Sequence, residues 1–481
     1  MLMMIDRNIH LAYFEPKKGH MKNPGMGIQA YVFSDHMHYG FNTAQFRKTE
    51  TDSPNNKLSR GTFDRMLQLP YTDNLYFRTD WCNIQKEKGK LHIQEELEWL
   101  LEAVRSSGRK WSFRIMNSSR HSVKNNSVPD FLQGKLEMLS YKNGTSGHGT
   151  SYFPAYTEEY MKWWEELLHL LADRFDDNPH LEFVDISGYG IWGEGHHYGT
   201  HGQDNFNSNY HAPNAEDVLT RFISGHEKIF AKTSVAMTLH YLDYQAGMDT
   251  VENTNIWLRR DSFSRLASKY EYEAVTRPKP GRAMIWETIV PEVREMQPVM
   301  FSRERLVQRY LDWGAHYIAM GFNPWEVIYA HQFDPSLYEQ IAEKIGYRIR
   351  PSMVMRRINE RVEHELIVVM SNDGCVSPPG KITLTAAFPS GKSVSIDLPA
   401  GAPGVNDKVY YTIPFPKEDF GCTSSQNAVL TMTLTMKGKV YPVKWAVRQA
   451  LYDDHQVSVP LIMPCRGDPF LTPSGTYEPV L

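Results

Sequence analysis

Short runs of apolar and aromatic residues alternate with stretches of helical periodicity between residues 24 and 346. Each run has a length that suits a strand, and the stretch after it repeats its apolar positions as an amphipathic helix does. In the segment 93–104, for example, apolar residues recur at intervals of three and four. The predicted strands lie at 27–33, 74–81, 110–117, 181–186, 234–241, 255–260, 283–287 and 316–322.

Strands that alternate with helices indicate a parallel sheet, because each helix carries the chain back to the starting edge. Eight such units favour closure into a (β/α)8 TIM barrel, although the helix after the fifth strand is weak. The alternative is an open, doubly wound sheet. That fold often carries a glycine-rich phosphate loop after its first strand, and none occurs here. We therefore predict an α/β protein whose residues 1–346 form the barrel.

The pattern changes from about residue 350 onward. Runs rich in Val, Ile, Thr and Tyr are separated by turn sequences such as SPPG at 377–380 and PAGAPG at 399–404. This spacing predicts a C-terminal antiparallel β-sandwich domain at 347–481. We expect an accessory domain that supports the barrel, and an independent sugar-binding role is the alternative.

The composition narrows the possible partners. The chain has 481 residues and a formal net charge of −4, without a basic run that would indicate nucleic acid or a membrane surface. It contains no apolar run of membrane-spanning length, and its start lacks the apolar core of a signal peptide. We expect a soluble protein that is cytoplasmic, or secreted or periplasmic if a signal peptide was removed. The four cysteines form no CxxC pair, which argues against a zinc ribbon or a redox motif.

Two predicted strands lead into glutamates with a tryptophan close by. The fourth continues into GYGIWGE, which contains Trp192 and Glu194, and the seventh ends in Trp286 and Glu287. Catalytic groups of such barrels lie at the C-terminal ends of the strands. Strands four and seven stand on opposite sides of the barrel mouth. Glycoside hydrolysis needs two carboxyl groups across the scissile bond, so Glu194 and Glu287 are the predicted catalytic pair.

Other strand ends supply hydrogen-bonding groups and aromatic rings, which suit the hydroxyls and the apolar C–H face of a sugar. Arg78, Asp80 and Arg114 equally fit a buried ion-pair network inside the barrel. Glu326, which lies beyond Pro324, is the rival candidate for the nucleophile. The predicted substrate-binding residues are Arg78, Asp80, Arg114, Tyr189, Trp192, His196, His240, Arg260, Trp286, Trp325 and Glu326.

A histidine-rich loop follows Glu194 and raises a metal hypothesis. His196, His197 and His201 occur within GHHYGTHG, where glycines separate the potential ligands. This spacing lacks the fixed helical pitch of a zinc-binding pair. We expect no metal and no cofactor, and a metal-dependent hydrolase is the alternative that this loop keeps open.

Several segments resemble the clan A retaining glycoside hydrolases, in particular bacterial barrel proteins of polysaccharide degradation. They are NPGMG at 23–27, YFRTDW at 76–81, and GYGIWGE at 188–194 with His196. The resemblance covers the barrel and implies that Glu194 is the acid/base and Glu287 the nucleophile. The chain departs from the pattern at Gly193, because many clan A enzymes have there an Asn that binds the sugar 2-hydroxyl.

Together these features predict a glycoside hydrolase that cleaves an oligo- or polysaccharide with retention. The alternative is a catalytically silent barrel that binds carbohydrate. For retention we expect the carboxyl oxygens of Glu194 and Glu287 about 5–5.5 Å apart, whereas a gap of about 6.5–9.5 Å indicates inversion.

Overall fold

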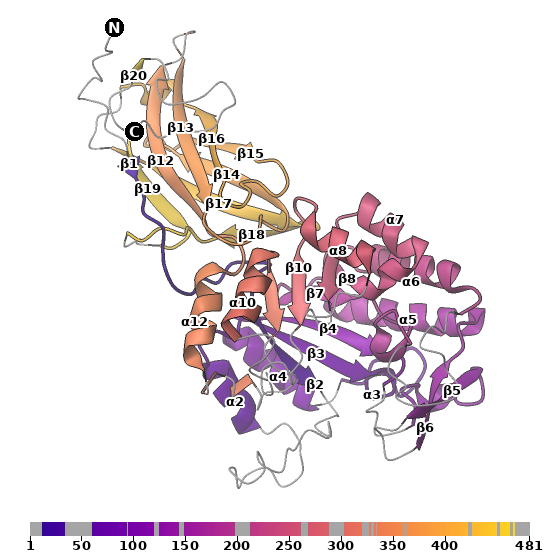
Figure 1. Ribbon diagram of the computed structural model, residues 1–481. Helices are drawn as coiled ribbons and strands as arrows, with labels where there is room; N and C mark the ends of the chain where they lie inside the picture. Colours follow the sequence, from indigo (N-terminus) through magenta and orange to yellow (C-terminus); the bar gives the residue numbers. More distant parts are fainter. Residues whose placement is uncertain are drawn as a thin grey trace.

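Eight of the described strands are parallel and close into a barrel (Figure 1). This arrangement confirms the predicted (β/α)8 fold. In barrel order the strands are β2 (Gly27–Phe33), β3 (Asn74–Asp80), β4 (Lys110–Met116), β7 (Leu181–Asp185), β8 (Ser234–Thr238), β9 (Trp257–Arg260), β10 (Met284–Glu287) and β11 (Tyr317–Ala319). The computed structural model describes residues 12–33, 60–93, 95–119, 125–143, 149–197, 212–260, 268–287, 303–319, 327–328, 331–332, 334–358, 361, 363–421, 426–449, 453–461 and 465–466.

Helices surround the barrel. α5 begins where Thr157 accepts a hydrogen bond from the Tyr160 amide, and α12 begins with Asp334 and Pro335 as the sequence predicts. The weakly predicted connection after the fifth strand is filled by a short helix, α7. The helices are α2 (Arg60–Gln68), α3 (Trp81–Ile84), α4 (Glu95–Ser106), α5 (Glu158–Phe175), α6 (Ala215–Ile229), α7 (Gln245–Asn253), α8 (Lys269–Thr276), α10 (Arg303–Asp312) and α12 (Pro335–Lys344).

Shorter elements interrupt the loops at the C-terminal ends of the strands. A β-hairpin, β5 (Met138–Asn143) and β6 (Gly149–Pro154), lies between β4 and α5. The 3-10 turns are η1 (Asp130–Leu132), η2 (Ile191–Gly193), η3 (Leu239–Asp243) and, in the C-terminal part, η5 (Lys417–Asp419). Among the described residues, no helix has both the length and the apolar character needed to cross a bilayer.

Two sheets form the C-terminal part, and their inner faces share one packed core. Buried and more accessible residues alternate along β14 and β17, as expected for strands with a single buried face. All pairs within the sandwich are antiparallel except that of β20 with β12, which is parallel. The first sheet contains β1 (Ala12–Tyr13), β12 (Ile349–Ile358), β13 (His364–Asn372), β16 (Lys408–Pro414) and β20 (Cys465–Arg466). The second contains β14 (Lys381–Ala387), β15 (Ser393–Asp397), β17 (Asn427–Met436), β18 (Lys439–Val443) and β19 (Gln456–Pro460).

The N-terminal segment pairs with the C-terminal sheet before the chain enters the barrel. Ala12 lies opposite Val354 in an antiparallel pair, and Pro16 forms a bridge with Val447. This pairing places the first described residues on the sandwich, which also contains the last described residues. The domain boundary between residues 346 and 347 stays a prediction.

The sandwich packs against the end of the barrel opposite the predicted site. His316, just before β11, contacts the Ser377 carbonyl at 2.9 Å, and Lys439 Nζ donates to the Asn178 carbonyl at 3.2 Å. These barrel residues precede their strands, so they lie at the N-terminal ends. In Figure 1 the arrow of β10 points away from the sandwich. The C-terminal strand ends are therefore left to form a site.

Candidate active site

A tight loop after β7 positions Glu194. Gly193 has φ 69°, and a Cβ added there would lie 2.8 Å from the Ser187 Cβ. This crowding explains why no side chain, and hence no asparagine, stands directly before Glu194. The Trp192 amide donates to the Ser118 carbonyl at 2.7 Å, and Thr238 Oγ1 donates to the Glu194 carbonyl at 2.6 Å. The segment just after β4 and the last residue of β8 therefore fix the backbone around Glu194.

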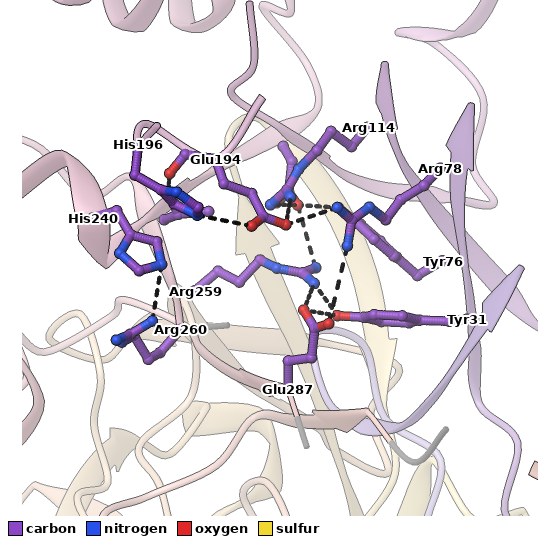
Figure 2. A network of polar contacts seen from close by, with 12 residues as sticks. Tyr31, Tyr76, Arg78, Arg114, Glu194, His196, His240, Arg259, Arg260 and Glu287 are labelled. Carbon is purple, nitrogen blue, oxygen red and sulfur yellow. Dashed lines mark hydrogen bonds and ion pairs between the residues drawn. The ribbon is translucent and has the colours of Figure 1, made fainter. Parts of the chain in front are cut away.

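The Glu194 carboxyl group is buried and surrounded by cations. Its side chain is 1% exposed. Oε1 accepts hydrogen bonds from Arg78 Nη2 at 2.7 Å and Arg114 Nη1 at 2.6 Å, while Oε2 lies 3.3 Å from His196 Nε2 (Figure 2). Two guanidinium groups thus bind one oxygen, and an imidazole faces the other.

Glu287 is the last residue of β10 and is equally buried. Tyr31 on β2 donates to its Oε2 at 2.6 Å, and Arg259 Nη2 binds the same oxygen. Arg78 Nη1 lies 4.0 Å from Oε1, so a single guanidinium adjoins both glutamates. Figure 2 shows the carboxyl groups of Glu194 and Glu287 pointing toward one another. The separation of their oxygens stays a prediction.

Asp185, the last residue of β7, connects the two halves of the network. Its Oδ2 accepts a hydrogen bond from Arg114 Nη2 at 2.8 Å and from the Tyr76 hydroxyl, and it lies 3.2 Å from Arg259 Nη1. Burial raises the pKa of Asp185, and Arg114 and Tyr76 offset this effect only in part. Asp185 therefore holds two arginines that bind different glutamates.

Formal charges balance within this buried network. Isolated charges in a protein interior are costly, and pairing offsets that cost. With every group ionised, three positive and three negative side chains cancel. Its members are Arg78, Arg114, Arg259, Asp185, Glu194 and Glu287.

Several predicted site residues gather here. Arg78, Arg114 and His196 contact Glu194 directly. Behind His196, the His240 ring packs at a centroid distance of 4.3 Å, and Arg260 Nη1 lies 3.0 Å from His240 Nε2. The Trp192 ring stands edge-on to His196, with a centroid distance of 6.3 Å.

Three other predicted residues contact neighbours other than the glutamates. Asp80 accepts a hydrogen bond from Ser127 at 2.8 Å, and Tyr189 stacks on Tyr156 with a centroid distance of 4.4 Å. Trp286 donates to the Gly314 carbonyl at 2.7 Å from the face of β10 opposite Glu287, because successive strand residues alternate. Substrate contacts by Asp80 and Tyr189 stay a prediction, whereas Trp286 faces away from Glu287. Trp325 and Glu326 lie outside the described residues.

Reasoning from the sequence missed several members of the network. The predicted site did not include Tyr31, Tyr76 or Asp185. It included Arg260, whereas the neighbouring residue Arg259 binds Glu287. The available signal was the two-residue period of a strand, because Tyr76 shares a face with Arg78. That signal shows which residues share a face but not which face is turned inward.

No group of three or more His, Cys, Asp or Glu side chains is arranged to hold a metal ion within the described ranges. His201, part of the metal hypothesis, lies outside them. The expectation that no metal or cofactor takes part stays a prediction.

Comparisons with known proteins add little to this geometry. No family model matches the chain, and no curated protein matches it significantly. Among solved structures, the catalytic domain of a β-amylase from Paenibacillus polymyxa is 10% identical, with TM-score 0.41, covering 66% of this chain and 98% of that one. A GH5_18 protein from Streptomyces cattleya in complex with GlcNAc is 14% identical, with TM-score 0.36 and coverages of 62% and 70%.

A further similar structure is a glycoside hydrolase family 5 enzyme from Prevotella bryantii in complex with a xyloglucan tetradecasaccharide. It is 11% identical, with TM-score 0.34, and covers 66% of this chain and 99% of that one. At such identities and TM-scores these similarities decide neither the reaction nor the substrate.

Proposed function

We propose that the chain is a glycoside hydrolase that cleaves glycosidic bonds of an oligo- or polysaccharide with retention. One observation carries the proposal: two buried glutamates point toward one another at the C-terminal face of a (β/α)8 barrel. Hydrolysis of a glycosidic bond requires two carboxyl groups in this relation.

Glu287 is the proposed nucleophile. Tyr31 and Arg259 both donate to its Oε2, which stabilises the ionised form needed for attack. Its carboxylate attacks the anomeric carbon and forms a covalent glycosyl-enzyme. Water then hydrolyses this ester and restores Glu287.

Glu194 is the proposed acid/base. Arg78 and Arg114 bind its Oε1, so Oε2, the oxygen next to His196, carries the transferred proton. In the first step this proton passes to the leaving oxygen. In the second step the same carboxylate takes a proton from the attacking water.

A barrel that binds carbohydrate without cleaving it is the second candidate. The feature that favours it is the complete pairing of both glutamates with arginines, which also occurs in structural ion-pair networks. Turnover separates the two candidates. The silent barrel retains a carbohydrate ligand without releasing product, whereas the hydrolase releases reducing sugar.

A panel of aryl glycosides and polysaccharides, assayed with wild type and two variants, tests the proposal. Glu287→Gln is expected to lose turnover on every substrate, because the nucleophile is gone. Glu194→Gln is expected to retain the first step on substrates with good leaving groups, with azide replacing the activated water in the second. Equal loss in both variants without azide rescue would contradict these roles.

A further inference from the structure

A buried chain of polar side chains leads from α8 to Glu194, and the proposed reaction leaves its far end unused. It starts at Glu271 in the first turn of α8, whose side chain is 1% exposed. Glu271 Oε2 lies 3.3 Å from Arg260 Nε, and its Oε1 lies 3.9 Å from His240 Nδ1. The Glu271 carboxylate therefore faces Arg260, the last residue of β9, and His240, which lies in η3 directly after β8.

Arg260 determines the state of His240. Arg260 Nη1 lies 3.0 Å from His240 Nε2, and a guanidinium can only donate, so Nε2 accepts. The ring proton of His240 is then on Nδ1, the nitrogen that faces Glu271. The contacts therefore specify one tautomer and one orientation of the ring.

The His240 ring packs against the His196 ring and thereby restricts its orientation (Figure 2). The two rings stand edge to face, with a centroid distance of 4.3 Å and an interplanar angle of 67°. His196 Nε2 lies 3.3 Å from Glu194 Oε2. His196 therefore contacts both Glu194 and His240, and the Trp192 ring lies beside it.

We propose that Glu271 and Arg260 are positioning residues for proton transfer by Glu194. They fix His240, and His240 holds His196 against the oxygen that carries the proton. This inference rests on the proposed function and deepens it. It concerns the first step, in which Glu194 acts as the acid. Tyr31 and Arg259 position Glu287 for its attack, and neither residue belongs to this chain of contacts.

A comparison of leaving groups tests the proposal. Glu271→Gln and Arg260→Met are assayed on dinitrophenyl and phenyl glycosides of the sugar that the wild type accepts best. A dinitrophenolate leaves without protonation, whereas phenolate needs the acid. We expect kcat/KM on the phenyl glycoside to fall at least about tenfold, and that on the dinitrophenyl glycoside to stay within about twofold.

The matched control is Glu273→Gln on the same helix, which removes an ion pair with Lys269 at 3.6 Å on a partly exposed face. This variant should match the wild type on both glycosides. Equal losses on both glycosides in the two test variants, or no loss, would overturn the positioning role while leaving the hydrolase intact. A wild type that hydrolyses no glycoside would instead remove the proposed function, and this inference with it.

Discussion

The tyrosine on β2 illustrates how single side chains set the chemistry of this site. Tyr31 donates to Glu287 at 2.6 Å and also contacts Arg259. A hydrogen bond to a charged group contributes about 1.5–3 kcal/mol. Tyr31→Phe should therefore lower kcat/KM about 10- to 100-fold in steady-state assays. Tyr338→Phe, which removes a hydroxyl on α12, should leave it unchanged. Equal activity in both variants would exclude a role for the Tyr31 hydroxyl.

A buried histidine behind the Glu194 loop makes stability depend on pH. His226 lies between the Phe222 carbonyl and the Ser187 amide, and burial lowers its pKa to about 4. Above about pH 6.5 the ring is neutral in both the folded and the unfolded state. As the pH falls from there toward 4, only the unfolded chain gains the proton, so folding stability is lost.

The loss attributable to His226 should reach roughly 3 kcal/mol at about pH 4. Urea unfolding of the wild type and of His226→Gln, measured between about pH 7.5 and about pH 4, checks this value. The variant should lose less stability over that interval. Parallel pH curves for the two proteins would show that another group is responsible.

At the level of single residues, the sequence predicted those members of the network that lie near or beyond the ends of strands. Glu194, Glu287, Arg78 and Arg114 follow from the rule that barrel sites form at strand ends. Tyr31 could not be found in this way, because its strand, GIQAYVF, is otherwise nearly apolar and resembles core packing.

At the level of elements, the loop between β7 and α6 decides where Glu194 points. Gly193→Ala would place a Cβ 2.8 Å from Ser187 Cβ, at a φ of 69°. We expect a loss of about 1–3 kcal/mol in unfolding free energy. We also expect a loss of kcat/KM that the lower stability alone does not explain, because Glu194 moves with the loop.

Gly225→Ala is the matched control, because Gly225 lies within α6 and a Cβ there has nothing within 4 Å. That substitution should stabilise the protein by about 0.5–1 kcal/mol. Chemical denaturation and activity assays on both variants check the pair. A fully active Gly193→Ala would show that the loop tolerates a side chain there.

Whole elements were easier to predict than their contacts. Strand positions followed from apolar runs, and the weak fifth connection proved to be a short helix, α7. The hairpin of β5 and β6 was missed, because its glycine- and serine-rich sequence resembles a plain loop. Trp286 was placed beside Glu287 by proximity in sequence, yet strand alternation turns it the other way.

At the scale of the whole molecule, the barrel and the sandwich share a core. One buried cluster joins Tyr31 and Tyr76 inside the barrel to Leu384 and Leu430 in the sandwich. Since removal of either part exposes this cluster, we expect one cooperative unfolding transition. Calorimetry and tryptophan fluorescence should give coincident midpoints. Two separated transitions would show that the barrel and the sandwich unfold independently.

Covalent trapping identifies the carboxylate that attacks the sugar, which we propose to be Glu287. A 2-deoxy-2-fluoro aryl glycoside with a good leaving group slows hydrolysis of the glycosyl-enzyme, so the intermediate accumulates. Intact-protein mass spectrometry should show one added glycosyl unit, and peptide mapping should place it on Glu287. An adduct on another carboxylate, such as Asp185, would contradict the role of Glu287. Turnover with inversion at the anomeric carbon and without any adduct would contradict the retaining mechanism.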